Sequence, residues 1–299
     1  MKNYKKYIST LFVFLLFVTW SNLSNAAAAC EGTGTVASPI TDTGAALECM
    51  SEPDIYRIKV YEMGLCTIKP TLTNMSTACN AISTITAGGL ITVARGVETV
   101  VPGTFVRPIN GTYNYGYLIL APEFRITATK TFTTTFTGKA STGTTCWSLD
   151  GILRDAGGTA SYNSSGTMTP VSDDTRSTFL AECSATASDA DPKETIIVQD
   201  SFNGTDLNGG GVATASFSVD GTSVTGTLTD DNYVIPGSSA AVTKLVGFVT
   251  FAKPLIITND SSKFISSFKT IHGTLVSYAD ANKLTYFGSG PFFPKLSVE

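Results

Sequence analysis

Histidine, tryptophan and charged side chains are scarce in this sequence. The 299 residues include one His and two Trp, and only 15% of them are charged. The Lys and Arg residues form no cluster, and a chain without grouped basic side chains is poorly suited to neutralise nucleic-acid phosphates. Residues 1–28 hold three of the 20 basic residues and no acidic residue. The rest of the chain therefore has 17 basic and 24 acidic residues, a net charge of −7. We therefore expect no nucleic-acid partner.

Long apolar runs are missing after residue 28, and the run near the start is short. Met1–Lys6 is basic, Ile8–Trp20 is a mostly apolar run of 13 residues, and Ala26–Ala29 offers small residues to a peptidase. This order is typical of a secretory signal, and the run is shorter than the ~20 residues that cross a bilayer as a helix. The sequence predicts a signal peptide at 1–28 and an exported mature chain without a transmembrane helix. Its location would be the periplasm, the outer cell surface or the medium.

Recognisable catalytic motifs are also missing. The single histidine, His272, lies in an apolar run, and no Gly-x-Ser-x-Gly sequence supports a Ser-His-Asp triad. Glycoside hydrolysis by paired carboxylates stays open as an alternative. The glutamates that could supply such a pair are Glu98, Glu123, Glu182 and Glu194. Most Asp residues fall in turn-like clusters, where their side chains bond the local backbone. We expect a protein that is not an enzyme.

The six cysteines include no Cys-x-x-Cys pair, which argues against a zinc or redox site. They are Cys30, Cys49, Cys66, Cys79, Cys146 and Cys183. An even number of cysteines in an exported chain predicts disulfide bonds. Sequential pairing closes short loops and predicts Cys30–Cys49, Cys66–Cys79 and Cys146–Cys183, although sequence alone leaves other connectivities open. Because Ala27-Ala28-Ala29-Cys30 resembles a lipobox, lipidation of Cys30 is an alternative. It would leave an odd number of cysteines for disulfide bonding.

Threonine is the commonest residue, at 45 positions, and short β-prone runs are separated by Gly, Pro, Asn and Asp. Branching at Cβ favours strands, because the stiff side chain packs well on a pleated surface. Ile55–Tyr61 alternates apolar and basic residues, and Asn110-Gly111 and Asp220-Gly221 are typical of tight turns between strands. The pattern predicts an all-β fold, an antiparallel β-sandwich.

The sequence suggests one place where the chain could divide into two β modules. Residues 184–192 are rich in Ser, Ala and Asp and contain no large apolar side chain. A boundary there predicts an N-terminal β module at 29–183 and a C-terminal β module at 193–299, stacked or fused. The alternative is a single domain.

Three tyrosines alternate along one predicted strand. Tyr113, Tyr115 and Tyr117 are expected on one face, because strand side chains repeat every two residues. They predict either an exposed aromatic stripe that binds a ligand or a buried strand face. Gly111-Thr112-Tyr113 also resembles the Gly-x-Tyr corner of extracellular sandwiches, in which the tyrosine hydroxyl bonds the backbone.

Calcium is the candidate metal. The Gly-rich segment Asp200–Gly211 contains four side chains with the oxygen ligands that Ca²⁺ prefers, namely Asp200, Asn203, Asp206 and Asn208. The spacing begins like an EF-hand but lacks the remaining ligands and the terminal Glu. A turn without metal is the alternative interpretation.

Two stretches resemble a group of uncharacterised, secreted, Thr-rich β-proteins of marine bacteria. One is Cys49–Cys79, which includes Pro53-Asp54-Ile55-Tyr56 and Gly64-Leu65-Cys66. The other is Gly111–Trp147, which begins with the tyrosine-rich strand and ends with Cys146-Trp147. The resemblance implies an exported β-rich protein and supplies no catalytic residue.

The leading functional hypothesis is a non-enzymatic exported surface, adhesive or assembly subunit. Its basis is the signal, the cysteines and a strand-rich chain whose exposed edges could accept a strand from a neighbouring protein, including a second copy. A periplasmic or extracellular module that binds a carbohydrate or another small ligand is the alternative, and an outer-membrane β-barrel is a second one.

Overall fold

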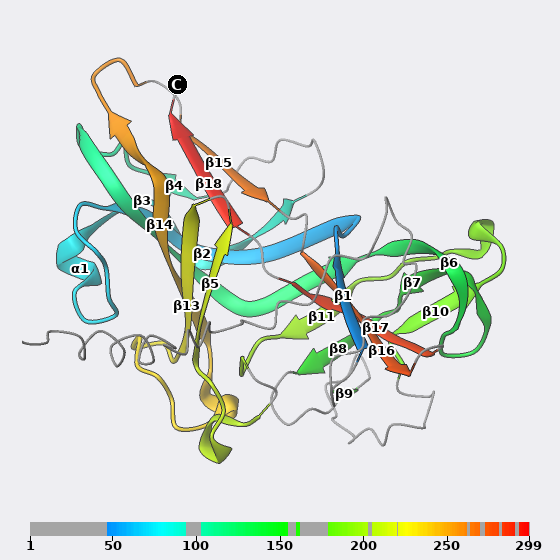
Figure 1. Cartoon of the computed structure of the whole chain (residues 1–299). Helices are drawn as coiled ribbons and strands as arrows, with labels where there is room; N and C mark the ends of the chain where they lie inside the picture. Colours follow the sequence, from blue (N-terminus) through cyan, green and yellow to red (C-terminus); the bar gives the residue numbers. More distant parts are fainter. Residues whose placement is uncertain are drawn as a thin grey trace, which may run out of the picture.

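The computed structural model describes most of the chain beyond its first 46 residues. The described residues are 47–93, 103–154, 160–161, 179–202, 205–219, 221–261, 264–269, 273–280, 283–290 and 293–298. The chain is mostly β-strand, and several largely antiparallel sheets pack together as in a β-sandwich (Figure 1). The predicted all-β fold class is therefore confirmed.

Strands account for nearly all of the regular structure. They are β1 (Leu47–Ser51), β2 (Ile55–Cys66), β3 (Cys79–Val93), β4 (Thr104–Phe105), β5 (Gly111–Thr127), β6 (Thr129–Thr137), β7 (Thr142–Ser148), β8 (Gly151–Arg154), β9 (Ala160–Ser161), β10 (Ala181–Ser184), β11 (Thr195–Val198), β12 (Thr214–Val219), β13 (Thr222–Thr229), β14 (Lys244–Ile257), β15 (Phe264–Lys269), β16 (Thr274–Asp280), β17 (Lys283–Ser289) and β18 (Phe293–Val298). The helical elements are short: α1 (Met75–Ala78) and 3₁₀ turns at Ala187–Asp189, Leu207–Gly209 and Ser239–Ala241.

The largest sheet has ten strands and is built around the long strand β5. One edge of β5 pairs with β2, which continues to β3 and β4. Its other edge pairs with β14 over one part of its length and with β11 over another. The sheet continues from β14 through β13 to β12, and from β11 through β8 to β9. Strand β12 therefore lies at one end of this sheet.

A second sheet has six strands, in the order β1-β16-β17-β6-β7-β10, and β15 pairs with β18 in a third. In Figure 1, β6, β7 and β10 lie on the right, and β13 and β14 of the large sheet lie on the left. Most neighbours are antiparallel; β8 with β11, and β6 with β17, are parallel.

The described sheets do not divide at residues 184–192. Strand β14 pairs with β5, and β16 pairs with β1, so strands from the predicted modules 29–183 and 193–299 complete the same sheets. The run of small and acidic residues is instead a connection between β10 and β11, which belong to different sheets. Its polarity reflects exposure of a loop and marks no separation of hydrophobic cores.

One large hydrophobic cluster joins the sheets. Its most buried side chains include Tyr56, Ile58, Phe136, Leu228 and Phe287, which come from both sheets and from both halves of the chain. The predicted alternation of β2 is confirmed, because Ile58 and Val60 are buried whereas Arg57 and Lys59 are half-buried. Burial of such side chains contributes roughly 1.5–3 kcal/mol each and is the main source of stability.

The two predicted turns have different outcomes. Val219 pairs with Thr222, so β12 and β13 form the predicted hairpin, and Gly221 adopts a left-handed φ of 77°. The turn predicted at Asn110-Gly111 joins no hairpin, because the preceding strand β4 pairs with β3 and β5 pairs with β2, β14 and β11. A turn dipeptide specifies a local bend, whereas the choice of partner strand depends on distant residues.

Candidate functional site

The structure divides the three predicted tyrosines between two clusters. Tyr113 is 2% exposed and packs in the main core, where its hydroxyl donates to the carbonyl of Ile109 at 2.8 Å. This contact is the one expected of the Gly-x-Tyr corner. Tyr115 and Tyr117 pack in a second cluster. Leu118 of the same strand faces the main core, so this second cluster lies on the opposite face of the ten-stranded sheet.

We call this second group the tyrosine cluster. Its rings are Tyr61, Tyr115, Tyr117, Tyr233 and Phe248. They pack together with the buried Cys66 and Ile119 and with Met75 and Cys79. The rings come from β2, β5, β14 and the loop that follows β13. Sequence reasoning found only two of the five rings, because the others become neighbours through strand pairing.

Charged groups lie among these rings. The Tyr117 hydroxyl donates to Glu62 Oε1 at 2.5 Å, and burial together with that carboxylate raises the pKa of Tyr117. Lys244 Nζ lies 3.6 Å from the centre of the Tyr61 ring, a cation–π contact, and 3.2 Å from Asp231 Oδ1. Hydrogen bonds from Thr243 and Lys244 lower the pKa of Asp231. The cluster thus combines aromatic faces with both signs of charge.

Tyr233 has the most unusual backbone of the cluster. Its φ is 61°, the left-handed region that residues other than Gly rarely adopt. The turn is held by Asp230, whose Oδ1 accepts hydrogen bonds from the amides of Asn232 and Val234, both at 2.9 Å. Such a conformation costs on the order of 1–3 kcal/mol and persists where the surroundings impose it. Val234 and Ile235, which follow, are exposed apolar side chains.

Gly64 makes room for the Tyr117 ring. A Cβ at Gly64 would lie 2.3 Å from a Tyr117 ring carbon and 2.4 Å from the Asn80 carbonyl oxygen. The ring therefore lies directly over the glycine backbone of the paired strand, where Gly64 is the register partner of Tyr117. Any side chain at position 64 would displace it.

The side chains of two of the four predicted calcium ligands, Asp200 and Asp206, have other partners in the structure. The Asp200 side chain is 4% exposed and lies 3.1 Å from Arg154 Nη1. Asp206 Oδ1 caps the turn at Leu207–Gly209 by accepting from the Asn208 amide at 3.0 Å. Asn203 lies outside the described residues. Among the described residues, no three His, Cys, Asp or Glu side chains converge in a way that could hold a metal ion.

The glutamates considered for hydrolysis make structural contacts. Glu194 lies 2.7 Å from Arg57 and 3.1 Å from Arg125, and Glu123 lies 3.6 Å from Arg125. Arg57 and Arg125 are direct register partners on β2 and β5, so Glu194 neutralises two like charges on neighbouring strands. Glu98 and His272 lie outside the described residues.

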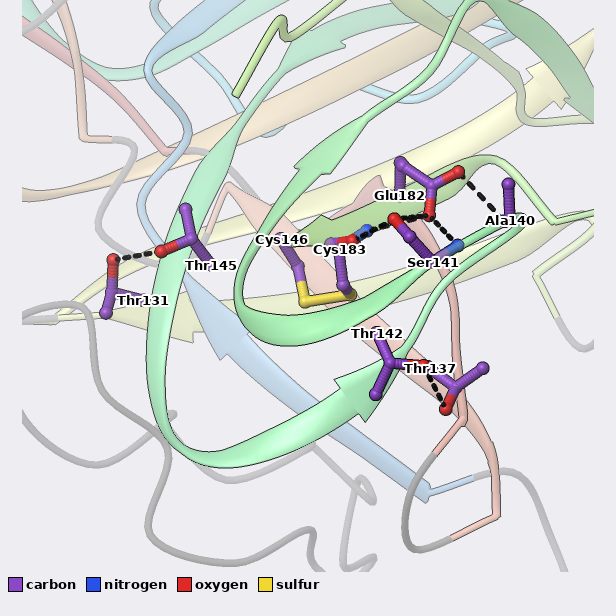
Figure 2. The surroundings of a disulfide bond; sticks show 9 residues. All are labelled: Thr131, Thr137, Ala140, Ser141, Thr142, Thr145, Cys146, Glu182 and Cys183. Atoms are coloured by element: carbon purple, nitrogen blue, oxygen red, sulfur yellow. Dashed lines mark hydrogen bonds between the residues drawn. A yellow bond between two sulfur atoms is a disulfide. The ribbon is translucent and has the colours of Figure 1, made fainter. Parts of the chain in front are cut away.

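Glu182 fixes a turn beside a disulfide bond. Its carboxylate accepts from the amides of Ala140, Ser141 and Cys183, at 2.8, 2.9 and 3.0 Å. Figure 2 shows these bonds next to the Cys146–Cys183 bridge, which joins register partners on β7 and β10. The residue thus ties the β6–β7 turn to the edge strand β10.

Two predicted disulfides are confirmed, Cys66–Cys79 and Cys146–Cys183. Cys49 is also disulfide-bonded, and its predicted partner Cys30 lies outside the described residues. Such bonds persist in an oxidising compartment of the kind that exported proteins enter.

A cavity of about 260 Å³ lies near the end of β14, where the sequence indicated no site. It is lined by Ile82, Phe105, Val106, Arg107, Pro108, Ile257, Ser261, Phe264 and Val298. The Arg107 guanidinium donates to the Thr258 carbonyl at 2.6 Å and to Asn110 Oδ1 at 3.0 Å. Its charge thus holds two loops together at the cavity rim.

The edge strand β12 is the other notable surface. Six residues pair with β13 in regular register, and β13 is its only partner strand within the described ranges. Strand β12 contains Thr, Ala, Ser, Phe and Val and no charge or proline. Phe217 is 38% exposed, and its neighbours Ser216 and Ser218 are exposed as well.

No helix in the described part of the chain is long and apolar enough to cross a membrane. Comparison with protein-family models, with curated proteins and with solved structures found no match to this chain.

Proposed function

We propose that this chain is an exported, non-enzymatic protein that serves at the cell surface as a structural, adhesive or assembly subunit. The observation that carries the proposal is the uncharged edge strand β12 at the end of the ten-stranded sheet. Open edges of this kind pair with other chains, and proteins that avoid such pairing place charges, prolines or bulges there. The disulfide bonds support export, because they add stability in an oxidising environment.

Surface exposure is tested on intact cells of the native host. Cells are treated with a protease or a membrane-impermeant amine label, then fractionated, and the protein is followed with an antibody. We expect labelling of the protein in intact cells and its recovery with surface material. Recovery only as an unlabelled periplasmic protein would contradict the proposal.

The tyrosine cluster favours a second candidate function, binding of a neutral oligosaccharide. The specific observation is the left-handed backbone of Tyr233. A strained backbone of this kind is retained where a side chain must be held in place for a function. Aromatic rings offer an apolar face to sugar rings, and Glu62 and Lys244 offer hydrogen-bonding groups to hydroxyls. The nearby Glu62 and Asp231, in an acidic chain, favour an uncharged ligand over an anionic one.

Calorimetric titration with cellohexaose and chitohexaose tests this second candidate. In Tyr233→Asn the ring is removed, whereas asparagine tolerates the left-handed backbone, so the fold should persist. We expect at least tenfold weaker binding in this variant and unchanged binding in the control Val234→Ala. Failure of the wild-type protein to bind either sugar, or equal binding by Tyr233→Asn, would rule the candidate out.

A further inference from the structure

The hydrogen-bond pattern of β12 shows which of its backbone groups face outward. The Leu228 amide donates to the Ala213 carbonyl at 2.8 Å, just before β12 begins. Antiparallel pairs alternate between bonded and non-bonded positions, so Ala215 and Phe217, in the same register, also bond β13. Thr214, Ser216 and Ser218 therefore direct their amide and carbonyl groups away from the sheet.

Within the described residues, this outward edge carries no charge, no proline and no bulge. Its register with β13 runs from Thr214 to Val219 without a bulge. Thr214, Ser216 and Ser218 are exposed, small and uncharged. Proteins that keep an edge unpaired usually place a lysine, a proline or an irregularity there.

We propose that β12 pairs with β12 of a second copy of this chain, antiparallel and centred on Ser216. Outward residues must face outward residues, and centring on Ser216 places Thr214 opposite Ser218, so that all three outward residues of β12 pair. Any other allowed register leaves at least one of these three residues without a partner in the second β12. The inference rests on the assembly role proposed above and names its partner.

Charge and symmetry favour an identical copy over a different partner. Antiparallel pairing of identical strands produces a two-fold axis, the commonest symmetry of homo-oligomers. Two copies of an acidic chain repel through most of their surfaces, but the uncharged β12 adds no repulsion where the two strands would meet. Thr214 would face Ser218, so the side chains that meet across the interface are small, uncharged hydroxyls. A charged peptide would find no counter-charge on this strand.

Sedimentation velocity of the exported protein across a concentration series tests the inference. We expect a reversible dimer. Ser216→Pro removes an outward amide that no β13 bond uses, and proline is tolerated on an edge. We expect it to raise the dimer dissociation constant at least tenfold, because the two-fold axis repeats the loss in both copies. Ser218→Lys places two lysines at the interface and should have a similar effect, whereas Ser216→Thr, the matched control, should change the constant less than threefold.

Two results would overturn the inference. One is a wild-type protein that stays monomeric up to about 100 μM, since its dissociation constant for dimer formation would then lie above that concentration. The other is a dimer that neither Ser216→Pro nor Ser218→Lys weakens, since pairing would then use another surface. Labelling of intact cells tests the surface role separately. A labelled monomer would refute only the β12 pairing, and an unlabelled periplasmic dimer would refute only the surface role.

Discussion

At the scale of single residues, the few charged side chains serve specific structural contacts. Glu182 holds a turn, Asp200 pairs with Arg154, and Glu194 lies between two arginines. These acids are the ones that a search for catalytic or metal-binding carboxylates selects first. Their contacts account for their positions without any reaction.

Glu194→Gln should destabilise the fold. The change leaves the guanidinium groups of Arg57 and Arg125 facing each other on paired strands, with the longer contact between Glu123 and Arg125 as their remaining carboxylate contact. We expect a loss of about 1–2 kcal/mol in the free energy of unfolding, measured with urea, and a smaller loss in 0.5 M salt. Glu123→Gln is the control, because Glu123 contacts only one of these arginines and at a longer distance. Equal losses in both variants would contradict the bridging role.

Alkaline titration should separate buried from exposed tyrosines. Burial raises the pKa of Tyr56, Tyr113 and Tyr233, and burial with Glu62 raises that of Tyr117. The folded protein therefore holds these protons more tightly than the unfolded chain does. The contribution of these four tyrosines to the free energy of unfolding is complete below the ordinary tyrosine pKa of about 10. It is lost as the pH rises above that value.

Absorbance at 295 nm measures this titration. We expect part of the tyrosine signal of the native protein to appear only at higher pH than in urea, together with falling stability between about pH 10 and 12. Tyr117→Phe should remove one of the late-titrating groups. Identical titration curves for folded and unfolded protein would disprove the prediction.

At the scale of elements, strand pairing depends on close backbone approaches that small residues permit. Gly143 in β7 lies against the end of β10, where an added Cβ would be 1.8 Å from the Ser184 carbonyl carbon. The obstacle is backbone and cannot rotate away. The disulfide and the Glu182 bonds hold the same strands together (Figure 2).

Gly143→Ala should separate β7 from β10 locally. Overpacking against backbone typically costs roughly 1–3 kcal/mol, and we expect a loss at the upper end of this range. Thermal and urea unfolding would measure it. Gly237→Ala is the matched control, because a Cβ there meets nothing within 4 Å. A Gly143→Ala protein as stable as the control would show that this approach is not tight.

At the scale of the whole molecule, each described disulfide joins neighbouring strands of one sheet. One links β2 to β3 in the ten-stranded sheet, and the other links β7 to β10 in the six-stranded sheet. The Cys66–Cys79 bond closes a separation of 13 residues and the Cys146–Cys183 bond one of 37. In the chain-entropy view, the longer loop restricts the unfolded chain more.

Removal of either bond should lower stability, and the longer loop should matter more. Replacing both Cys146 and Cys183 by Ala should cost about 4 kcal/mol, and replacing Cys66 and Cys79 about 3 kcal/mol. Urea unfolding of the oxidised proteins would measure the difference. The untreated protein should show no free thiol on reaction with a thiol reagent in urea. Free thiols, or a larger loss for the shorter loop, would contradict the account.

The sequence by itself determined the features that depend on neighbours along the chain. Threonine content and alternation predicted strands, the segment around Asp220-Gly221 predicted a hairpin, and cysteine order predicted two bonds that the structure contains. Local propensity and short loops dictate each of these. The Tyr113 contact with Ile109 is equally local, spanning four residues.

Only the tertiary structure decided how distant strands combine. The tyrosine cluster, the two arginines bridged by Glu194 and the cavity near Phe105 each unite residues more than 100 positions apart. Strand pairing across residues 184–192 is likewise a tertiary feature, because β14 completes the sheet begun by β5. A strand pattern specifies which face is apolar, but it leaves open which of many similar strands will cover it, and that choice is made by packing of the whole core.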